Sequence, residues 1–149
     1  MRFMMLMIPA GYEKAPPGQY PDRKAIETMM KYNEELGKAG VLLALDGLHP
    51  PSMGARVSFK DGKPRVTDGP FAEAKEVLGG YWMIQVKSRE EAIEWAKRCP
   101  ASENETIEVR QVMEWSDGPP DVQQMEVEQN ERLKAAGVSP EPGSKAKQA

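Results

Sequence analysis

Along residues 3–115, apolar residues with the spacing of strands alternate with apolar residues at helical spacing. The order of these segments limits the fold more than any other feature of the chain. Residues 3–8 are an unbroken apolar run, which is the pattern of a strand buried on both faces. Residues 22–36 then repeat apolar side chains at helical spacing, and Gly37 and Gly40 mark the end of this predicted helix. A second apolar run, residues 41–45, predicts the next strand.

The middle of the chain predicts a β-hairpin followed by a further strand. Apolar and polar residues alternate over residues 55–59, Asp61-Gly62 is a typical two-residue hairpin turn, and residues 65–67 form the returning strand. Residues 72–76 have the composition of one helical turn. They lead into a strong strand over residues 81–86.

A second helix and a last strand complete the pattern. Ser88 and Glu91 have the spacing of a capping box, and Pro100 ends the helix directly after Cys99, which we interpret as a buried apolar residue. Residues 106–115 alternate between apolar and polar side chains and predict the last strand.

Without the hairpin, the predicted order is the βαββαβ arrangement of ferredoxin-like α+β folds, with both helices on one face of an antiparallel sheet. We expect the hairpin to lie at an edge of this sheet. The other face of the sheet needs a cover, and a second copy of the same face is the simplest one. The sequence therefore predicts a two-fold homodimer.

The composition changes near residue 116, so we expect one α+β domain over residues 1–116 and an extension over residues 117–149. Within the extension, Val122, Met125 and Leu133 form a thin apolar stripe in a charged, glutamine-rich segment. This pattern predicts a marginal helix that ends near Gly137 and is followed by a disordered tail.

Charge and cysteine content exclude several classes of protein. The chain has 20 basic and 23 acidic residues that are mixed along its length, so no basic surface for nucleic acid is expected. A single cysteine excludes an intrachain disulfide and is typical of a reducing compartment, so we expect the protein in the cytoplasm. The opening apolar run is too short for a signal peptide or a membrane span, and no membrane interaction is expected.

The sequence predicts neither a metal site nor a cofactor. Because the chain has one histidine and one cysteine, its other possible metal ligands are mainly carboxylates, and the sequence has no motif with metal-ligand spacing. Gly79-Gly80 precedes a strand, whereas a phosphate-binding loop must lead into the N-terminus of a helix. This pair of glycines instead indicates a bulge or a close approach of two backbones.

The segment from Val66 to Trp82, with the tetrapeptide Asp68-Gly69-Pro70-Phe71 near its start, resembles the signature of the YCII-related family in its DGPF branch. Similar motifs occur at Leu48-His49-Pro50, within residues 94–100 and at residues 107–110. The resemblance covers roughly residues 1–115 and implies a dimeric α+β barrel. Members of the wider superfamily include isomerases, dehalogenases and monooxygenases that act in a cleft between sheet and helices. In bacteria, genes of this branch often lie beside genes of extracytoplasmic-function sigma factors.

His49 and Asp68 are the candidate catalytic residues. His49 is the only histidine and follows a strand in a proline-bounded loop, where an imidazole can act as a general acid or base. The resemblance implies a His–Asp pair, in which Asp68 would orient the imidazole and stabilise its charge. Two alternatives remain: a loop histidine bonded to backbone or water, and an aspartate whose side chain stabilises the Gly-Pro turn.

Arg110, Lys75 and Glu73 are the candidate ligand-binding residues. They could form an anion-binding corner in which the Arg110 guanidinium pairs with the carboxylate of a small organic anion. The alternative is an ion-pair network in solvent. Two functions follow from these candidates: an enzyme that transfers protons between His49 and Asp68, and a non-catalytic ligand-binding or regulatory module that associates with a sigma factor.

Overall fold

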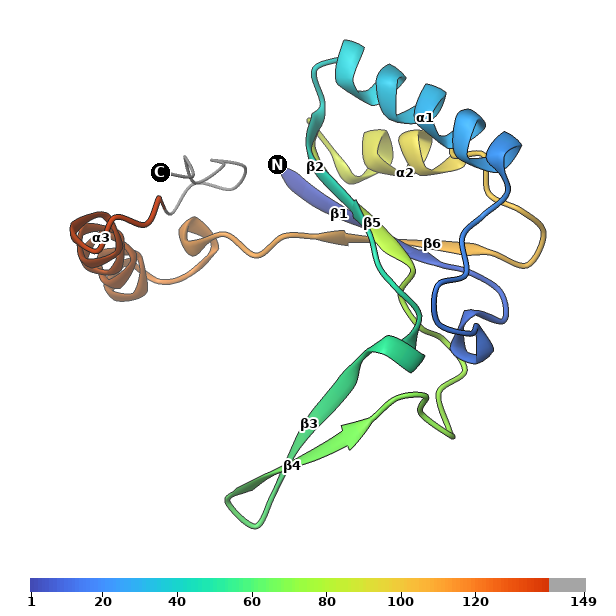
Figure 1. Cartoon of the computed structure of the whole chain (residues 1–149). Coiled ribbons are helices and arrows are strands. Elements are labelled where there is room, and N and C mark those ends of the chain that lie inside the picture. The colour runs from blue at the N-terminus through green and yellow to red at the C-terminus, as the bar shows by residue number, and fades with distance from the viewer. Residues whose placement is uncertain (140–149) are drawn as a thin grey trace.

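The computed structural model describes residues 1–139 and contains a four-stranded antiparallel sheet, a separate two-stranded sheet and three α-helices. In chain order, the elements are β1 (Arg2–Ile8), η1 (Tyr12–Lys14), α1 (Arg23–Lys38), β2 (Leu42–Gly47), η2 (Pro51–Met53), β3 (Ala55–Lys60), β4 (Lys63–Asp68), β5 (Gly80–Gln85), α2 (Arg89–Lys97), β6 (Thr106–Gln111), η3 (Trp115–Asp117) and α3 (Pro120–Ala135). Figure 1 shows α1 and α2 on the same face of the larger sheet, whereas the β3–β4 hairpin and α3 project from it.

The larger sheet has the strand order β2-β5-β1-β6, and all neighbouring strands are antiparallel. Strand β5 is inserted between β1 and β2, and the crossover through α1 joins the two strands that flank it. This is the split βαβ topology of ferredoxin-like folds. The predicted α+β class and βαββαβ order are therefore confirmed.

The hydrophobic core lies between the sheet and the two helices. Phe3, Met5 and Met7 of β1 are buried there, while the alternate residues Met4 and Leu6 face the other side and are only half-buried. The expectation that β1 is buried on both faces is therefore wrong for the single chain, because helices cover only one face of the sheet. The cluster of buried core residues consists of Phe3, Met5, Met7, Tyr32, Leu36, Trp82, Ile84, Val86 and Ala92.

Side-chain caps fix the beginnings of both helices. Asp22 accepts a hydrogen bond from the Ala25 amide at the start of α1, and Ser88 accepts one from the Glu91 amide at the start of α2. Glu91 in turn accepts from the Lys87 amide, one residue before the cap, so the predicted capping box is present with a shifted second bond.

Tyr32 and Cys99 connect the two helices to the core. The Tyr32 hydroxyl donates to the Trp95 carbonyl at 2.8 Å, and the Tyr32 ring meets Trp82 edge to face at 5.8 Å. Cys99 packs against the same core, and burial raises the pKa of its thiol to about 12. The thiol is therefore protonated at neutral pH, in agreement with its interpretation as an apolar residue.

The β3–β4 hairpin forms a sheet of its own, so the expectation that it lies at an edge of the main sheet is wrong. The turn itself is as predicted, with positive φ at Asp61 and Gly62. The chain leaves the main sheet after β2 because Pro50 and Pro51 have no amide hydrogen to donate to a strand ladder. At the base of the hairpin, the Gly69 amide donates to the Gly54 carbonyl at 2.9 Å.

Two further segments differ from the sequence-based expectation. Residues 72–76 form a turn and a bend rather than a helical turn. Helix nucleation is unfavourable, and a single helical turn is not stable unless another element packs against it. Strand β6 ends at Gln111 rather than at residue 115. Its partner β1 begins at Arg2, so residues 113–115 have no strand left to pair with.

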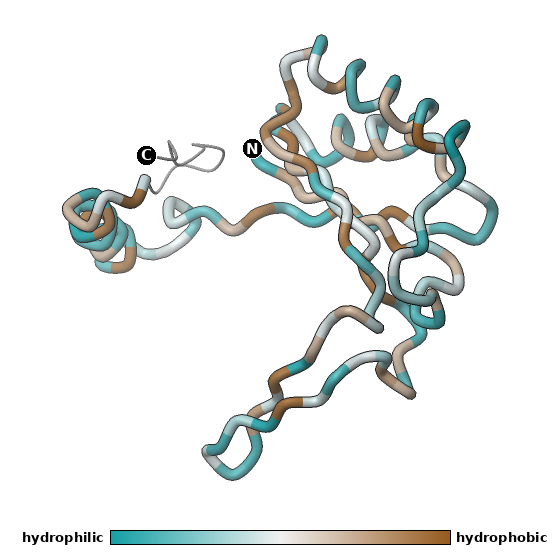
Figure 2. The backbone as a smooth tube through the Cα atoms, in the orientation of Figure 1, coloured by the Kyte–Doolittle hydropathy of each residue, from teal (hydrophilic) through white to brown (hydrophobic). Residues whose placement is uncertain are grey.

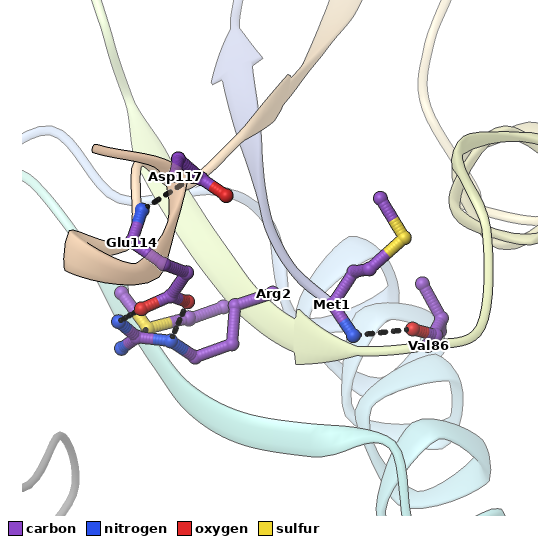
Figure 3. Close-up of polar contacts among 6 residues, drawn as sticks. Met1, Arg2, Val86, Glu114 and Asp117 are labelled. Carbon is purple, nitrogen blue, oxygen red and sulfur yellow. Dashed lines mark hydrogen bonds and ion pairs between the residues drawn. The ribbon is translucent and has the colours of Figure 1, made fainter. Parts of the chain in front are cut away.

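The C-terminal segment is attached to the first strand by a bidentate ion pair, shown in Figure 3. The Arg2 guanidinium donates to both carboxylate oxygens of Glu114, at 2.6 and 2.7 Å, and the Glu114 amide donates to Asp117. Helix α3 follows, in agreement with the predicted helix, and its end is marked by Gly137 with φ 77°. The predicted disordered tail falls mainly on residues 140–149, outside the described part of the chain. No helix within residues 1–139 is both long and apolar enough to cross a membrane.

Candidate functional site

A groove of about 570 Å³ lies between α1 and the end of the sheet formed by β1, β2 and β5. Its apolar lining consists of Met7, Pro9, Ala10, Pro21, Ala25, Ile26, Met29, Met30, Leu45, Trp82 and Pro100. Its polar side chains are those of Tyr12, Gln19, Tyr20, Asp22, Asn33, Asp46, Tyr81, Ser102 and Glu105. The groove therefore has a wide apolar wall together with several hydrogen-bonding groups.

A smaller hollow of about 250 Å³ shares lining residues with the groove and extends it to the loop after β2. Tyr12, Tyr20 and Gly79 line both spaces, and Leu48 and His49 line the smaller one. The Tyr20 and His49 rings meet edge to face with centroids 6.2 Å apart. The only imidazole of the chain thus lies at one end of a continuous groove.

Two glycines allow the backbones around the groove to approach closely. A Cβ atom on Gly80 would lie 2.8 Å from the Asp46 carbonyl oxygen, and one on Gly79 would lie 2.4 Å from the Pro9 ring. The Gly79 carbonyl accepts from the Leu48 amide at 2.9 Å, which holds the start of the His49 loop against β5. Of the two interpretations of Gly79-Gly80, close backbone approach is confirmed.

Tyrosine hydroxyls make the best-defined polar contacts of the groove. Tyr12 donates to the Leu48 carbonyl at 2.6 Å, and burial raises the pKa of the Tyr12 hydroxyl. Tyr81 donates to the Asp46 carboxylate at 2.8 Å, and this hydrogen bond raises the pKa of the Tyr81 hydroxyl. Both hydroxyls are therefore neutral near pH 7.

The floor of the groove is held by a side-chain hydrogen bond. The Trp82 indole NH donates to the Asn33 amide oxygen at 2.7 Å, and Trp82 is only 6% exposed. Since Trp82 comes from β5 and Asn33 from α1, this bond fixes the distance between the sheet and the helix along the groove.

Of the residues predicted for the site, only His49 lines these spaces. Asp68 is exposed at the end of β4, and no hydrogen bond joins it to His49 among the described residues. The two segments nevertheless meet through their backbones, because a Cβ on Gly69 would lie 1.7 Å from the Pro51 carbonyl oxygen.

The predicted anion-binding corner does not form within the described chain. Arg110 lies on the helix-free face of β6, opposite Met4, and its Nε is 3.7 Å from a Glu108 carboxylate oxygen. Lys75 and Glu73 are exposed in the irregular segment between β4 and β5. None of these three side chains lines the groove.

The charges of the groove are acidic. Asp22, Asp46 and Glu105 line it, and no lysine or arginine of residues 1–139 does. Within residues 1–139, no group of three or more His, Cys, Asp or Glu side chains is arranged to hold a metal ion. The groove therefore presents carboxylates as separate groups beside an apolar wall.

Sequence reasoning missed the tyrosines and Asp46. They come from separate segments around residues 12, 20, 46 and 81, and each looks like an ordinary loop or strand residue in its own context. The one local signal was Asp46-Gly47 directly after an apolar run, a place where functional side chains often lie.

Comparison with known proteins relates the chain to one domain family and to a bacterial protein. The model of the YCII-related domain matches residues 1–116. An uncharacterized protein of Rhizobium meliloti (strain 1021) is 32% identical over 76 residues, which are 51% of this chain. The matched region spans 61% of that protein's length.

Proposed function

The chain belongs to the YCII-related domain family, and from this premise we propose that its groove binds a small organic molecule with an apolar body and a polar end. The observation that carries the proposal is the groove itself. Its volume of about 570 Å³ is in the range of ligand-binding clefts, and its mainly apolar wall with a few hydrogen-bonding groups is typical of them.

The charges of the lining favour a neutral or cationic ligand. The carboxylates of Asp22, Asp46 and Glu105 would repel an anion. Arg110 and Lys75 do not line the groove, so their positive charges do not offset this repulsion. A cationic group could pair with Asp46, whose carboxylate already accepts from Tyr81. The small anionic ligand expected from the sequence has less support than a ligand of this kind.

His49 gives the site its capacity for proton transfer. It lies at the end of the groove beside Tyr20, where it could exchange a proton with the polar end of a bound ligand. Asp68 shares no hydrogen bond with it, so the proposed chemistry rests on His49 rather than on a His–Asp pair. Binding without catalysis is the second candidate, and the missing His–Asp bond favours it. The association of such a regulatory module with a sigma factor is a proposal that rests on the family resemblance alone.

We also propose that the chain functions as a homodimer. The helix-free face of the sheet carries half-buried apolar side chains such as Met4, Leu6 and Met83. The Arg2 guanidinium lies 3.9 Å from the Met83 sulfur, and no helix of residues 1–139 covers the rest of this face (Figure 1). A second copy of the same face would remove these side chains from water on both chains at once.

A fragment screen with a blocked groove tests the binding proposal. Ala25 lines the groove from α1, so Ala25→Phe should fill part of it, whereas Lys31→Phe places the same ring on the exposed side of the same helix. We expect ligand-observed NMR to find fragments that bind both the unmodified protein and Lys31→Phe, with at least tenfold weaker binding to Ala25→Phe. Equal binding to both variants, or no fragment binding to the unmodified protein, would contradict the proposal.

A further inference from the structure

The uncharged polar side chains of the groove have few hydrogen-bond donors left for a ligand. Those of Tyr12, Tyr81 and Trp82 each already donate to an acceptor within the protein. A hydroxyl and an indole carry one such hydrogen each, so these three groups offer a ligand no further donor. The side-chain amide of Asn33 keeps its NH2 group as a donor, because its oxygen accepts from the indole. The remaining uncharged polar side chains can accept as well as donate, and they are Gln19, Tyr20 and Ser102.

The three carboxylates of the groove are acceptors with capacity to spare. They come from separate segments of the chain: Asp22 precedes α1, Asp46 lies near the end of β2, and Glu105 precedes β6. Each accepts a single side-chain hydrogen bond within residues 1–139, whereas two carboxylate oxygens have about four lone-pair sites. No ion pair within the same residues joins any of the three to a lysine or an arginine. A complementary ligand is therefore positively charged and rich in N–H donors.

The wall of the groove suits the rest of such a ligand. Tyr20 lines both the groove and the smaller hollow and is 72% exposed, and the face of an aromatic ring attracts an ammonium group. Apolar side chains of α1 line the groove at a spacing of four residues, as Ala25 with Met29 and Ile26 with Met30. Figure 2 shows brown positions recurring along α1 between teal ones. Ile26 and Met30 are 38% and 56% exposed, so a bound apolar group would remove them from water.

We infer that the groove binds an organic ammonium ion, a ligand that carries a protonated amine on an apolar body. The inference rests on the binding site proposed above and names the chemical class of its ligand. A primary ammonium group has three N–H donors and no acceptor, so it matches the free carboxylate oxygens better than an alcohol, which has one donor. Its charge also offsets carboxylates that form no ion pair within residues 1–139. The apolar body then lies along the wall formed by α1.

Three probes with the same apolar body separate the charge of the ligand from its shape. 4-Phenylbutylamine, 4-phenylbutan-1-ol and 4-phenylbutanoate are a cation, a neutral molecule and an anion near pH 7. Ligand-observed NMR titration of the full chain measures their affinities. We expect the amine to bind about tenfold more tightly than the alcohol, and the carboxylate to bind more weakly than the alcohol.

A double substitution tests whether the groove carboxylates cause this preference. Asp46→Asn and Glu105→Gln remove two charges but keep an oxygen that can accept from Tyr81 and Ser102. Asp22 is left unchanged because it caps α1. We expect the advantage of the amine over the alcohol to fall at least fivefold in this variant, whereas the affinity for the alcohol stays within twofold.

The matched control removes the same two charges outside the groove. Glu103 and Asp121 are exposed, and neither lines the groove or the hollow. The double variant Asp121→Asn with Glu103→Gln should keep the advantage of the amine within twofold. An equal loss in both double variants would overturn the inference, because the amine would then respond only to the general attraction of a chain with net charge −3.

Equal binding of the amine and the alcohol would also overturn the inference, and so would tightest binding of the carboxylate. In both cases the groove remains a binding site, because an uncharged or anionic probe occupies it. If none of the three probes binds, the inference is wrong, and the groove itself is decided by the fragment screen with Ala25→Phe and Lys31→Phe.

Discussion

Replacing Glu114 by glutamine should lower the free energy of unfolding by about 1 kcal/mol at pH 7. The Glu114 carboxylate accepts two hydrogen bonds from Arg2, at 2.6 and 2.7 Å, and the Arg2 and Glu114 side chains are 23% and 34% exposed. Hydrogen bonds to charged groups contribute roughly 1.5–3 kcal/mol when buried, and exposed ion pairs roughly 0–1 kcal/mol. This pair lies between the two cases, and glutamine keeps one acceptor oxygen.

The pH dependence of the stability difference tests whether loss of the Arg2–Glu114 ion pair is its cause. The hydrogen bonds from Arg2 hold the pKa of Glu114 below its usual range. A lowered pKa in the folded state means that the contribution is complete above the pKa of the unfolded chain, about 4.3, and is lost as the pH falls through the folded value. The stability difference between the unmodified protein and Glu114→Gln should therefore be constant from pH 6 to 8 and shrink steadily below pH 5.

Urea denaturation at a series of pH values measures this difference, and a thermal melt should show a decrease of about 4 °C. Glu94→Gln is the matched control, because Glu94 accepts from Lys97 at a similar distance of 2.8 Å with both side chains about two-thirds exposed. We expect a change within about 0.5 kcal/mol for this control. A loss for Glu114→Gln that does not vary with pH would refute the ion-pair explanation, and would point to the role of Glu114 as the cap of η3.

Two further predictions concern the Asp-Gly-Pro-Phe tetrapeptide. Gly69→Ala should destabilise the chain by about 2 kcal/mol or more, because its Cβ would overlap the Pro51 carbonyl. Gly37→Ala, which meets no atom within 4 Å in α1, should instead be neutral or stabilising, and equal effects in urea denaturation would contradict the reasoning. Asp68→Asn should change fragment affinity in the groove by less than twofold, whereas His49→Gln should weaken the binding of fragments that contact the imidazole. A large effect of Asp68→Asn in the same NMR titration would restore the His–Asp pair.

The order of the elements could be predicted because it depends on local patterns. The spacing of apolar residues in α1 and β1, the cap at Ser88 and the Asp61-Gly62 turn each act within a few residues of sequence. The strand order followed because few topologies satisfy a βαββαβ pattern. The position of the hairpin did not follow, because it depends on the path that Pro50 and Pro51 impose between two sheets.

The site could be predicted only where a residue type was itself distinctive. His49 was identifiable as the single histidine after a strand, and it does line the smaller hollow that extends the groove. Tyr12, Asp46 and Tyr81 converge from distant segments, and a single sequence has no signal for such contacts. Arg110 was placed on the polar face of its strand, but this face lies on the side of the sheet opposite to the helices and the groove.

Backbone contacts link the Asp-Gly-Pro-Phe tetrapeptide to the loop of His49, and this link needs no hydrogen bond between His49 and Asp68. Gly69 packs against the Pro51 carbonyl, and the Gly69 amide donates to Gly54, so the end of β4 is held against the loop that begins at His49. Phe71 lies under the Arg56 guanidinium, 4.0 Å from it, and adds a second contact at the base of the hairpin. A bulkier residue in place of Gly69 would push this loop, and His49 with it, relative to the groove. The tetrapeptide therefore contacts the loop of the imidazole through the backbone, and Asp68 can be a regular partner of Ala55 in the hairpin without acting on the ligand.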